Sequence, residues 1–203
     1  MTITRHNKCN VTFFDDTILT LVTATPSLVD DWIVEIESFH RKKLDRLIVG
    51  LDCEWRACFS KPFVNYPVAT LQLCVGRRCL IFQILHAQYI PHSLKNFLNN
   101  NNYTFTGVKI GDDVAKLWRD YSIKVARTAD LRWLADDVYG EQELCCAGLK
   151  TLCRRVLGKE MEKPKKVTLS RWDKPWLTER QVIYACHDAF VSFEIGRVLI
   201  HGD

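Results

Sequence analysis

The sequence has little of what marks a secreted, membrane-spanning or zinc-bound protein. No stretch approaches the ~20 consecutive apolar residues that cross a bilayer, and residues 1–10 lack the apolar segment of a secretory signal. The cysteines number nine, which is odd, and none of them forms the paired CxxC pattern of a structural zinc site. We therefore expect reduced thiols, several of them in the core, and a protein of the cytoplasm or the nucleus that has no membrane partner.

Length and composition fit one globular domain. The chain has 203 residues, of which 47% are hydrophobic, and its net charge of +4 permits a nucleic-acid partner without requiring one. No internal repeat, low-complexity tract or interdomain linker is visible. We expect residues 1–203 to form a single domain, in which an N-terminal hairpin and helix (1–45) precede a core that carries the motifs (46–203).

Hydrophobic periodicity predicts an α/β fold with a mixed central sheet flanked by helices. Strands are expected at residues 11–14, 18–23, 47–54, 68–75, 79–84, 103–110 and 123–129. Helices are expected from residue 26 to the basic cluster 41–43 and at 93–99, 111–121, 131–138, 147–157 and 178–199. Thr178 and Gln181 have the spacing of a capping box at the start of the last helix. Residues 158–174 are basic without an apolar period, and we expect a loop along one edge of the functional site.

Four carboxylates lie in three separated segments that otherwise have the pattern of core. Asp52 and Glu54 follow an apolar run and share one strand face, since side chains alternate along a strand. Asp113 lies in the first turn of a helix, and Asp188 lies in the middle of the last helix. Buried carboxylates are costly without a partner, and hard oxygen ligands suit Mg²⁺ or Mn²⁺ better than zinc. Two such ions can activate water and stabilise a leaving oxygen, which indicates phosphodiester hydrolysis.

Each of these signals is weak when taken alone. Asp52 and Glu54 could be surface residues at a strand end, and Asp113 could be a helix residue favoured by the helix dipole. Tyr184 lies one helical turn before Asp188, where its phenol could orient the attacking water, but the two could also be an ordinary pair on a helix surface. Their order and their strand and helix contexts favour a joint site.

Three segments resemble the motifs of the DEDD superfamily of 3′–5′ exonucleases, in the version with a tyrosine (DEDDy). They are Val-Gly-Leu-Asp-Cys-Glu-Trp at 49–55, Gly-Val-Lys-Ile-Gly-Asp-Asp-Val-Ala-Lys-Leu at 107–117 and Tyr-Ala-Cys-His-Asp-Ala-Phe at 184–190. Residues 68–75 and 170–181 also resemble the Werner-exonuclease-like branch, and the likeness extends over about 47–199. The resemblance implies the DnaQ-like (RNase H-like) exonuclease fold.

The resemblance also implies roles for single residues. Asp52, Glu54, Asp113 and Asp188 would be ligands of two Mg²⁺ or Mn²⁺ ions, and Tyr184 would position the nucleophilic water. Asp112 leaves the register of the second motif ambiguous, and Asp113 fits the pattern better. His187 is not the catalytic histidine of the sister class, whose place falls at about Ile183.

One departure from the pattern bears on the substrate. Ala115 stands where the Werner-type pattern has a tryptophan, which weakens the expectation of duplex DNA. The compact chain resembles the small plant exoribonucleases that interact with RISC and clear its cleavage fragments in support of microRNA function. That subgroup implies single-stranded RNA as substrate, Argonaute partners and ring-shaped homohexamers. A Werner-like DNA exonuclease and an inactive scaffold that binds nucleic acid or protein remain the alternatives.

Contacts with a nucleic-acid strand are expected at both ends of the site. The backbone at Cys53 and the ring of Trp55 would lie beside the terminal nucleotide, although Trp55 could instead be a core aromatic. Arg171 and Lys174 could neutralise phosphates, or the basic loop could simply be solvated. Lys165 and Lys166 could neutralise phosphates in the same way.

The N-terminal hairpin carries the apolar residues Phe13, Phe14 and Ile18. These residues could be buried against a neighbouring subunit, or they could extend the sheet within one subunit.

Overall fold

The computed structural model describes residues 6–57 and 65–202 and arranges them around one mixed sheet of seven strands. The strands are β1 (His6–Phe13), β2 (Asp16–Thr23), β3 (Leu47–Trp55), β4 (Val68–Val75), β5 (Arg78–Phe82), β6 (Tyr103–Gly107) and β7 (Thr128–Asp130). Their order across the sheet is β1-β2-β5-β4-β3-β6-β7. The pairs β2–β5, β3–β6 and β6–β7 are parallel and the others antiparallel. The N-terminal hairpin is therefore part of the same sheet as the strand that carries Asp52.

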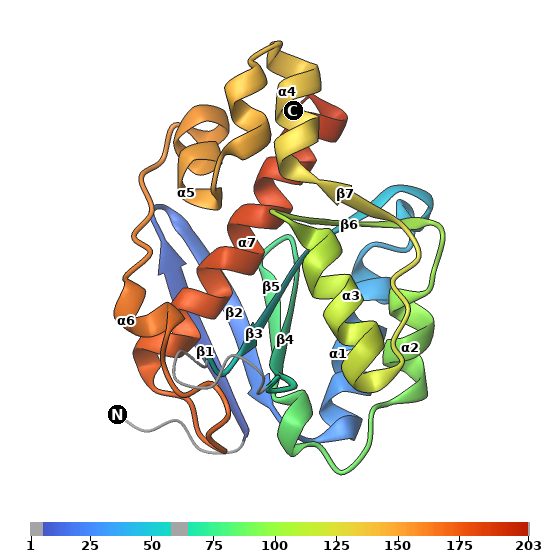
Figure 1. Ribbon diagram of the computed structural model, residues 1–203. Helices are drawn as coiled ribbons and strands as arrows, with labels where there is room; N and C mark the ends of the chain where they lie inside the picture. Colours follow the sequence, from blue (N-terminus) through green and yellow to red (C-terminus); the bar gives the residue numbers. More distant parts are fainter. Residues whose placement is uncertain (1–5, 58–64, 203) are drawn as a thin grey trace.

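Helices cover both faces of this sheet (Figure 1). They are α1 (Pro26–Phe39), α2 (His92–Leu98), α3 (Ile110–Tyr121), α4 (Leu131–Tyr139), α5 (Leu149–Leu152), α6 (Lys165–Thr168) and α7 (Glu179–His201). Phe105 of β6 packs against Phe97 of α2, whereas its neighbour Thr106 donates a hydrogen bond to the Ser192 carbonyl of α7. Since adjacent strand residues point to opposite faces, α2 and α7 lie on opposite sides of the sheet. Among the described helices, none is long and apolar enough to cross a membrane.

The long helix α7 lies unusually close to the strand that carries the first motif. A methyl group built on Gly50 of β3 would lie 2.0 Å from the Ala189 carbonyl oxygen and 2.6 Å from the Phe193 nitrogen. Farther along α7, Gly196 allows a similar approach to Thr106. Small residues at these positions let the helix backbone rest on the strand, which places Asp188 directly over β3.

The start of α7 has the predicted capping box. The Thr178 hydroxyl accepts a hydrogen bond from the Gln181 backbone, and the Gln181 side chain accepts one from the Thr178 backbone. These bonds satisfy donors that a helix start leaves open, so the beginning of α7 is fixed locally.

Two predicted strands are shorter than the apolar pattern suggested. The strand expected at 103–110 ends at Gly107, and α3 begins at Ile110 after Lys109, whose φ of 58° is left-handed. Lys109 is thus the N-cap, and α3 begins one residue before the predicted helix at 111–121. The strand expected at 123–129 is reduced to β7, because the backbone N–H groups of Ile123 and Ala126 bond to carbonyls at the ends of α3 and α2.

The basic stretch 158–174 is more structured than a solvated loop. It contains α6 and buries Met161, Val167 and Trp172, so three separated side chains anchor it without forming a periodic pattern. The thiols of Cys53, Cys74 and Cys186, which lie in apolar runs and are expected in the core, are buried and unbridged. Cys58 lies outside the described residues.

Of the two alternatives for the apolar hairpin residues, extension of the sheet within one subunit is the one that the structure shows for Phe13 and Ile18. Phe13 and Ile18 are buried, because β2 pairs with β5 and brings the hairpin into the main sheet. Only Phe14, at the turn, remains exposed, with 53% of its surface accessible. The sheet and its helices therefore already cover most of the apolar hairpin surface that a neighbouring subunit was expected to cover.

Candidate active site

Three of the four predicted carboxylates meet at one point. One carboxylate oxygen from each of Asp52, Glu54 and Asp188 lies within 4.8 Å of the others. The first two stand on the face of β3 that α7 covers, and Asp188 reaches them from α7. Glu54 and Asp188 are buried, at 9% and 3% exposed, so the group lies below the molecular surface.

The fourth carboxylate, Asp113, stands on the first turn of α3 and is not one of these three. It is buried, whereas the neighbouring Asp112 is exposed, and this supports the choice of Asp113 as the second-motif residue. Burial, followed by the nearby charge of Asp52, raises the pKa of Asp113 to about 9. Asp113 is therefore close enough to the three-residue group to interact electrostatically with Asp52.

The negative charge of these carboxylates is not balanced by positive charge and hydrogen-bond donors around them. Burial, and then the charge of Asp188, raises the pKa of Asp52 to about 7. Burial and the charge of Asp52 raise the pKa of Glu54 well above its usual value. The buried Oδ2 of Asp52 and Oδ1 of Asp188 have no hydrogen-bond partner among the described residues. Unpartnered buried carboxylate oxygens of this kind fit a hard divalent cation, which would take up lone pairs that the protein leaves free.

The site includes a cation of the protein itself that the sequence did not single out. The Nζ atom of Lys163 lies 2.6 Å from Oδ2 of Asp188. Burial opposes its charge, but the charges of Asp188 and Asp52 prevail and raise the pKa of Lys163. Nothing in the basic stretch distinguishes Lys163 from its neighbours, and only the path of residues 158–164 places it at the site.

Tyr184 stands one turn before Asp188 and is also buried. Its hydroxyl oxygen accepts a hydrogen bond of 3.1 Å from Thr168 of α6, and the buried Trp172 ring lies 6.0 Å from its ring. Burial, and then the charge of Asp188, raises the pKa of Tyr184, so the phenol keeps its proton and can donate it in a hydrogen bond. Thr168 and Trp172 hold this side chain, and neither was predicted from the sequence.

The two residues expected beside the terminal nucleotide differ in exposure. Cys53 is buried on the core side of β3, so only its backbone can face a ligand. Trp55 is partly exposed, and the ammonium of Lys116 lies 5.1 Å from its ring centre. Lys116 is itself buried, pairs with Asp120 at 3.0 Å and donates to the Tyr66 carbonyl. Trp55 thus lies against a lysine whose hydrogen bond to Tyr66 ties α3 to the chain before β4.

The predicted phosphate-binding residues Arg171 and Lys174 have contacts outside the carboxylate group. Arg171 makes two hydrogen bonds to Asp173, which also pairs with Arg56 just beyond β3. Lys174 is exposed, and its carbonyl accepts a weak hydrogen bond from Gln83. These contacts bring the basic loop to the end of β3, and phosphate binding by the two residues stays a prediction.

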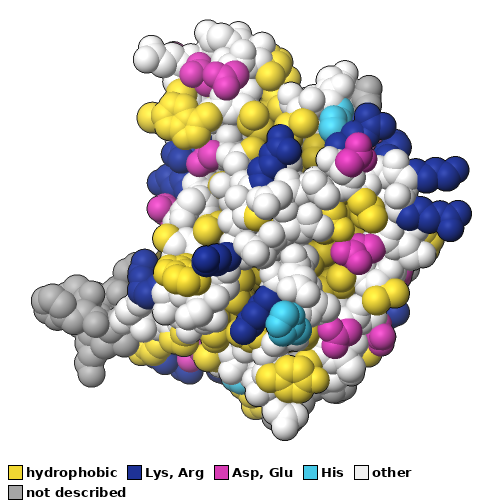
Figure 2. Space-filling view, turned by 90° about the vertical axis from the view of Figure 1, so that its right-hand side faces the viewer, with side chains coloured by type: hydrophobic (Ala, Val, Ile, Leu, Met, Phe, Trp, Pro, Cys, Tyr) yellow, Lys and Arg dark blue, Asp and Glu magenta, His cyan; other side chains and the backbone are white. Residues whose placement is uncertain are grey.

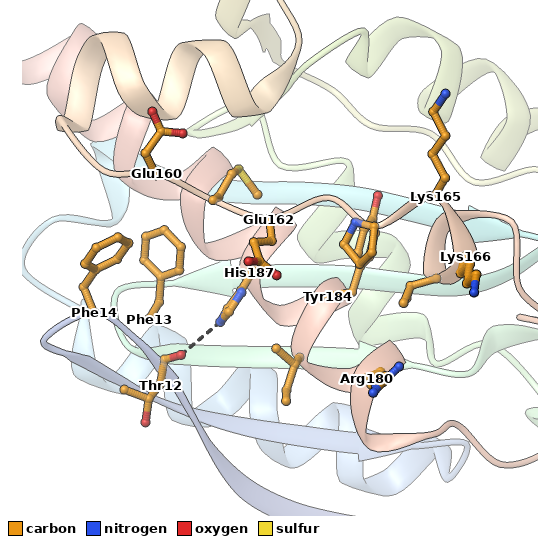
Figure 3. A pocket seen from close by; sticks show the side chains of 14 residues that line it. Thr12, Phe13, Phe14, Glu160, Glu162, Lys165, Lys166, Arg180, Tyr184 and His187 are labelled. Carbon is orange, nitrogen blue, oxygen red and sulfur yellow. Dashed lines mark hydrogen bonds between the residues drawn. The ribbon is translucent and has the colours of Figure 1, made fainter.

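A cavity of about 730 Å³ lies beside Tyr184, between the tip of the N-terminal hairpin and the segment 160–167 (Figure 3). Lys165, Lys166 and Arg180 contribute positive charge to its lining, and Phe14 contributes an exposed ring. His187 also lines it, and its Nε2 donates to the Thr12 carbonyl at 3.0 Å. The cavity adjoins the acidic group through Tyr184 and is lined by aromatic, basic and acidic side chains, the acidic ones being Glu160 and Glu162.

The pKa shifts predict how stability depends on pH after treatment with a chelator. A carboxyl whose pKa is higher in the folded than in the unfolded state binds more protons when folded. The free energy of unfolding then falls as pH rises from the unfolded value toward the folded one. Asp52 and Asp113 place this window between about pH 4 and pH 9. In EDTA we expect the free energy of unfolding to fall by on the order of 2–4 kcal/mol from about pH 5 to pH 8.

Urea unfolding at several pH values, in EDTA and with saturating Mn²⁺, measures this. The cation should reduce the decrease, because it replaces the protons that hold the acidic group together. An identical pH dependence with and without Mn²⁺ would contradict the electrostatic description of the site.

The fold and the carboxylate geometry together define the class of protein. A mixed sheet flanked by helices, with two carboxylates on a central strand and a third on a long helix across it, is the DnaQ-like (RNase H-like) exonuclease arrangement. Residues 23–199 match the family described as 3′-5′ exonuclease, so the chain belongs to that family.

Relatives of known name agree with this assignment. A 3′-5′ exonuclease of Arabidopsis thaliana is 32% identical over 168 residues, which are 82% of this chain and 57% of that protein. The bifunctional 3′-5′ exonuclease/ATP-dependent helicase WRN of Mus musculus is 35% identical over 166 residues, which are 80% of this chain and 12% of that protein. The chain thus spans just over half of one relative and a small part of the other.

Solved structures support the same fold. The exonuclease domain of EXD2, in crystals soaked in Mn and GMP, superposes with a TM-score of 0.51 at 26% identity and covers 90% of this chain and 89% of that one. RNase D of Escherichia coli, an exoribonuclease, has a TM-score of 0.66 at 18% identity and covers 84% of this chain and 42% of that one. At 18% identity, the similarity to RNase D shows the fold alone.

Proposed function

We propose that the chain is a metal-dependent 3′–5′ exonuclease that hydrolyses single-stranded nucleic acid, with RNA as the favoured substrate, to nucleoside 5′-monophosphates. The observation that carries the proposal is the buried group of Asp52, Glu54 and Asp188, with two carboxylate oxygens that lack partners, in a member of the 3′-5′ exonuclease family. An acidic group of this kind repels a phosphodiester unless cations are bound to it.

We propose that the acidic residues hold two Mg²⁺ or Mn²⁺ ions. Asp52, Glu54 and Asp188 would hold one, and Asp113 together with Asp52 would hold the other. Bound there, such ions neutralise phosphate charge and lower the pKa of water. Support for these metals comes from the similar EXD2 domain, whose crystals were soaked in Mn or Mg and in GMP. Tyr184 would orient the attacking water through its hydroxyl, with Thr168 holding the ring in place.

A single-stranded substrate is proposed because basic side chains line the cavity next to the acidic group. Lys165, Lys166 and Arg180 line the cavity beside Tyr184, where a flexible strand could lie with a base against the exposed ring of Phe14. Figure 2 shows another side of the molecule, over α2 and α3, where lysines and arginines stand among acidic side chains. The cavity beside Tyr184 lies away from that face, by α6 and the N-terminal hairpin.

RNA is favoured over DNA because of one position in α3 and because of the resemblance to exoribonucleases. Ala115 of α3 is exposed where the Werner-type pattern has a tryptophan, so an aromatic that could guide DNA is missing there. The likeness to the plant exoribonucleases also supports a role in clearing RISC fragments in the cytoplasm, with Argonaute partners and a ring-shaped homohexamer. Those four features are proposals that depend on the resemblance.

The proposal predicts which substrate is degraded and how. End-labelled single-stranded RNA, single-stranded DNA and recessed duplex DNA are compared at equal salt, with Mn²⁺ and with EDTA. We expect mononucleotides to be released from single-stranded RNA at least about tenfold faster than from either DNA, and no release in EDTA, since hydrolysis depends on the cations. Faster release from recessed duplex DNA would favour the Werner-like alternative, and strand binding that EDTA does not affect, without any product, would favour a scaffold.

A further inference from the structure

Lys163 bonds to one of the proposed metal ligands from outside the motifs. Its side chain is 30% exposed, whereas that of Asp188, its partner, is only 4% exposed. An ammonium that reaches a buried carboxylate at 2.6 Å forms a charge-assisted bond, and it neutralises one of the charges in the acidic group. Lys163 therefore contributes what a bound cation would also contribute.

Asp188 cannot pair equally well with the ammonium of Lys163 and with a divalent metal ion at the same time. Its Oδ1 has no partner among the described residues, and its Oδ2 contacts Lys163. A divalent cation on Asp188 would bring two more positive charges close to the ammonium, and like charges at such short range in a buried site repel strongly. The Lys163 stem is flexible and partly exposed, so the ammonium can move away toward solvent while the carboxylates stay fixed.

We propose that Lys163 competes with the divalent cation for Asp188, pairing with this carboxylate until the cation displaces it. The inference rests on the proposed function, because it takes the acidic group to be the cation site. Lys163 is therefore a positioning residue: it lowers the affinity of the acidic group for the metal.

The same displacement would reach Tyr184. The ammonium of Lys163 lies 5.3 Å from the centre of the Tyr184 ring, and the segment that carries Lys163 leads directly into α6, where Thr168 bonds the Tyr184 hydroxyl. Cation loading and the placement of the tyrosine are therefore linked through one short stretch of chain.

The test replaces Lys163 with methionine, which keeps a similar length without charge, and Lys150→Met is the matched control. Lys150 is exposed on α5 and loses the same charge far from the described acidic contacts. Titration calorimetry with Mn²⁺ on the whole chain, without nucleic acid, measures the affinity. Lys163→Met should bind Mn²⁺ at least about tenfold more tightly than the wild type, because the competing charge is gone, whereas Lys150→Met should match the wild type.

A second measurement is the melting temperature. In EDTA, Lys163→Met should melt below the wild type, and the rise on adding Mn²⁺ should be larger than in the wild type. Lys163→Gln keeps a hydrogen-bond donor for Asp188 and is predicted to show the same tighter binding, which keeps the test open if the methionine variant does not fold.

The possible failures are distinguishable. If the wild type and Lys163→Met bind Mn²⁺ with equal affinity, competition by Lys163 is refuted while the cation site stands. Weaker binding by both Lys163 variants would also refute it and would make the lysine an aid to cation binding. If no variant and no wild-type protein binds Mn²⁺, the proposed function itself fails, and the inference fails with it.

Discussion

Asp52→Asn is expected to lower the rate of hydrolysis at least about 10³-fold, because the carboxylate serves both proposed cations and an amide carries no charge for either. The same change should leave the free energy of unfolding unchanged or raise it by about 1–2 kcal/mol. Activity falls while stability does not, because Asp52 is buried: its Oδ2 atom has no partner in the described part of the chain, and burial disfavours the ionised form.

Initial rates on end-labelled RNA and urea unfolding in EDTA measure the two effects. Asp112→Asn is the matched control, since it removes the same charge from an exposed position beside the buried Asp113. It should leave both quantities near the wild-type values. An Asp52→Asn protein with full nuclease activity would exclude Asp52 from the metal-binding residues.

The acidic group could be found from the sequence because local rules determine most of it. Period two along a strand puts Asp52 and Glu54 on one face, and a helix across that face needs only one inward carboxylate to complete the group. The choice between Asp112 and Asp113 required the family pattern, and burial in the structure supports it. Helical spacing placed Tyr184 on the same helix face as Asp188, and its role came from the family pattern.

What could not be predicted depends on contacts between distant parts of the chain. Lys163 is one of several lysines in a stretch without periodicity, and its contact depends on how Met161 and Trp172 anchor that stretch. Phe13 and Ile18 are buried by the parallel pairing of β2 with β5, which no local pattern reveals. Lys109 takes a left-handed φ that its residue type does not favour, so the sequence did not identify it as the N-cap of α3.

Gly50→Ala is expected to lower the free energy of unfolding by at least about 3 kcal/mol, beyond the usual range for overpacking. The added methyl group would lie 2.0 Å from the Ala189 carbonyl oxygen, and backbone on both sides leaves no flexible side chain to yield. Strand and helix must separate, which also moves Asp188 from Asp52 and should reduce hydrolysis in the molecules that still fold.

Gly111→Ala provides the contrast within the same protein. Gly111 lies in the first turn of α3, and nothing lies within 4 Å of a methyl group built there. A helical alanine in open space should keep or slightly raise the stability, by up to about 1 kcal/mol. Urea unfolding of both variants separates close approach from a general intolerance of added methyl groups. Equal stability of Gly50→Ala and the wild type would mean that α7 does not rest on β3, and the helix would then not hold Asp188 over the strand.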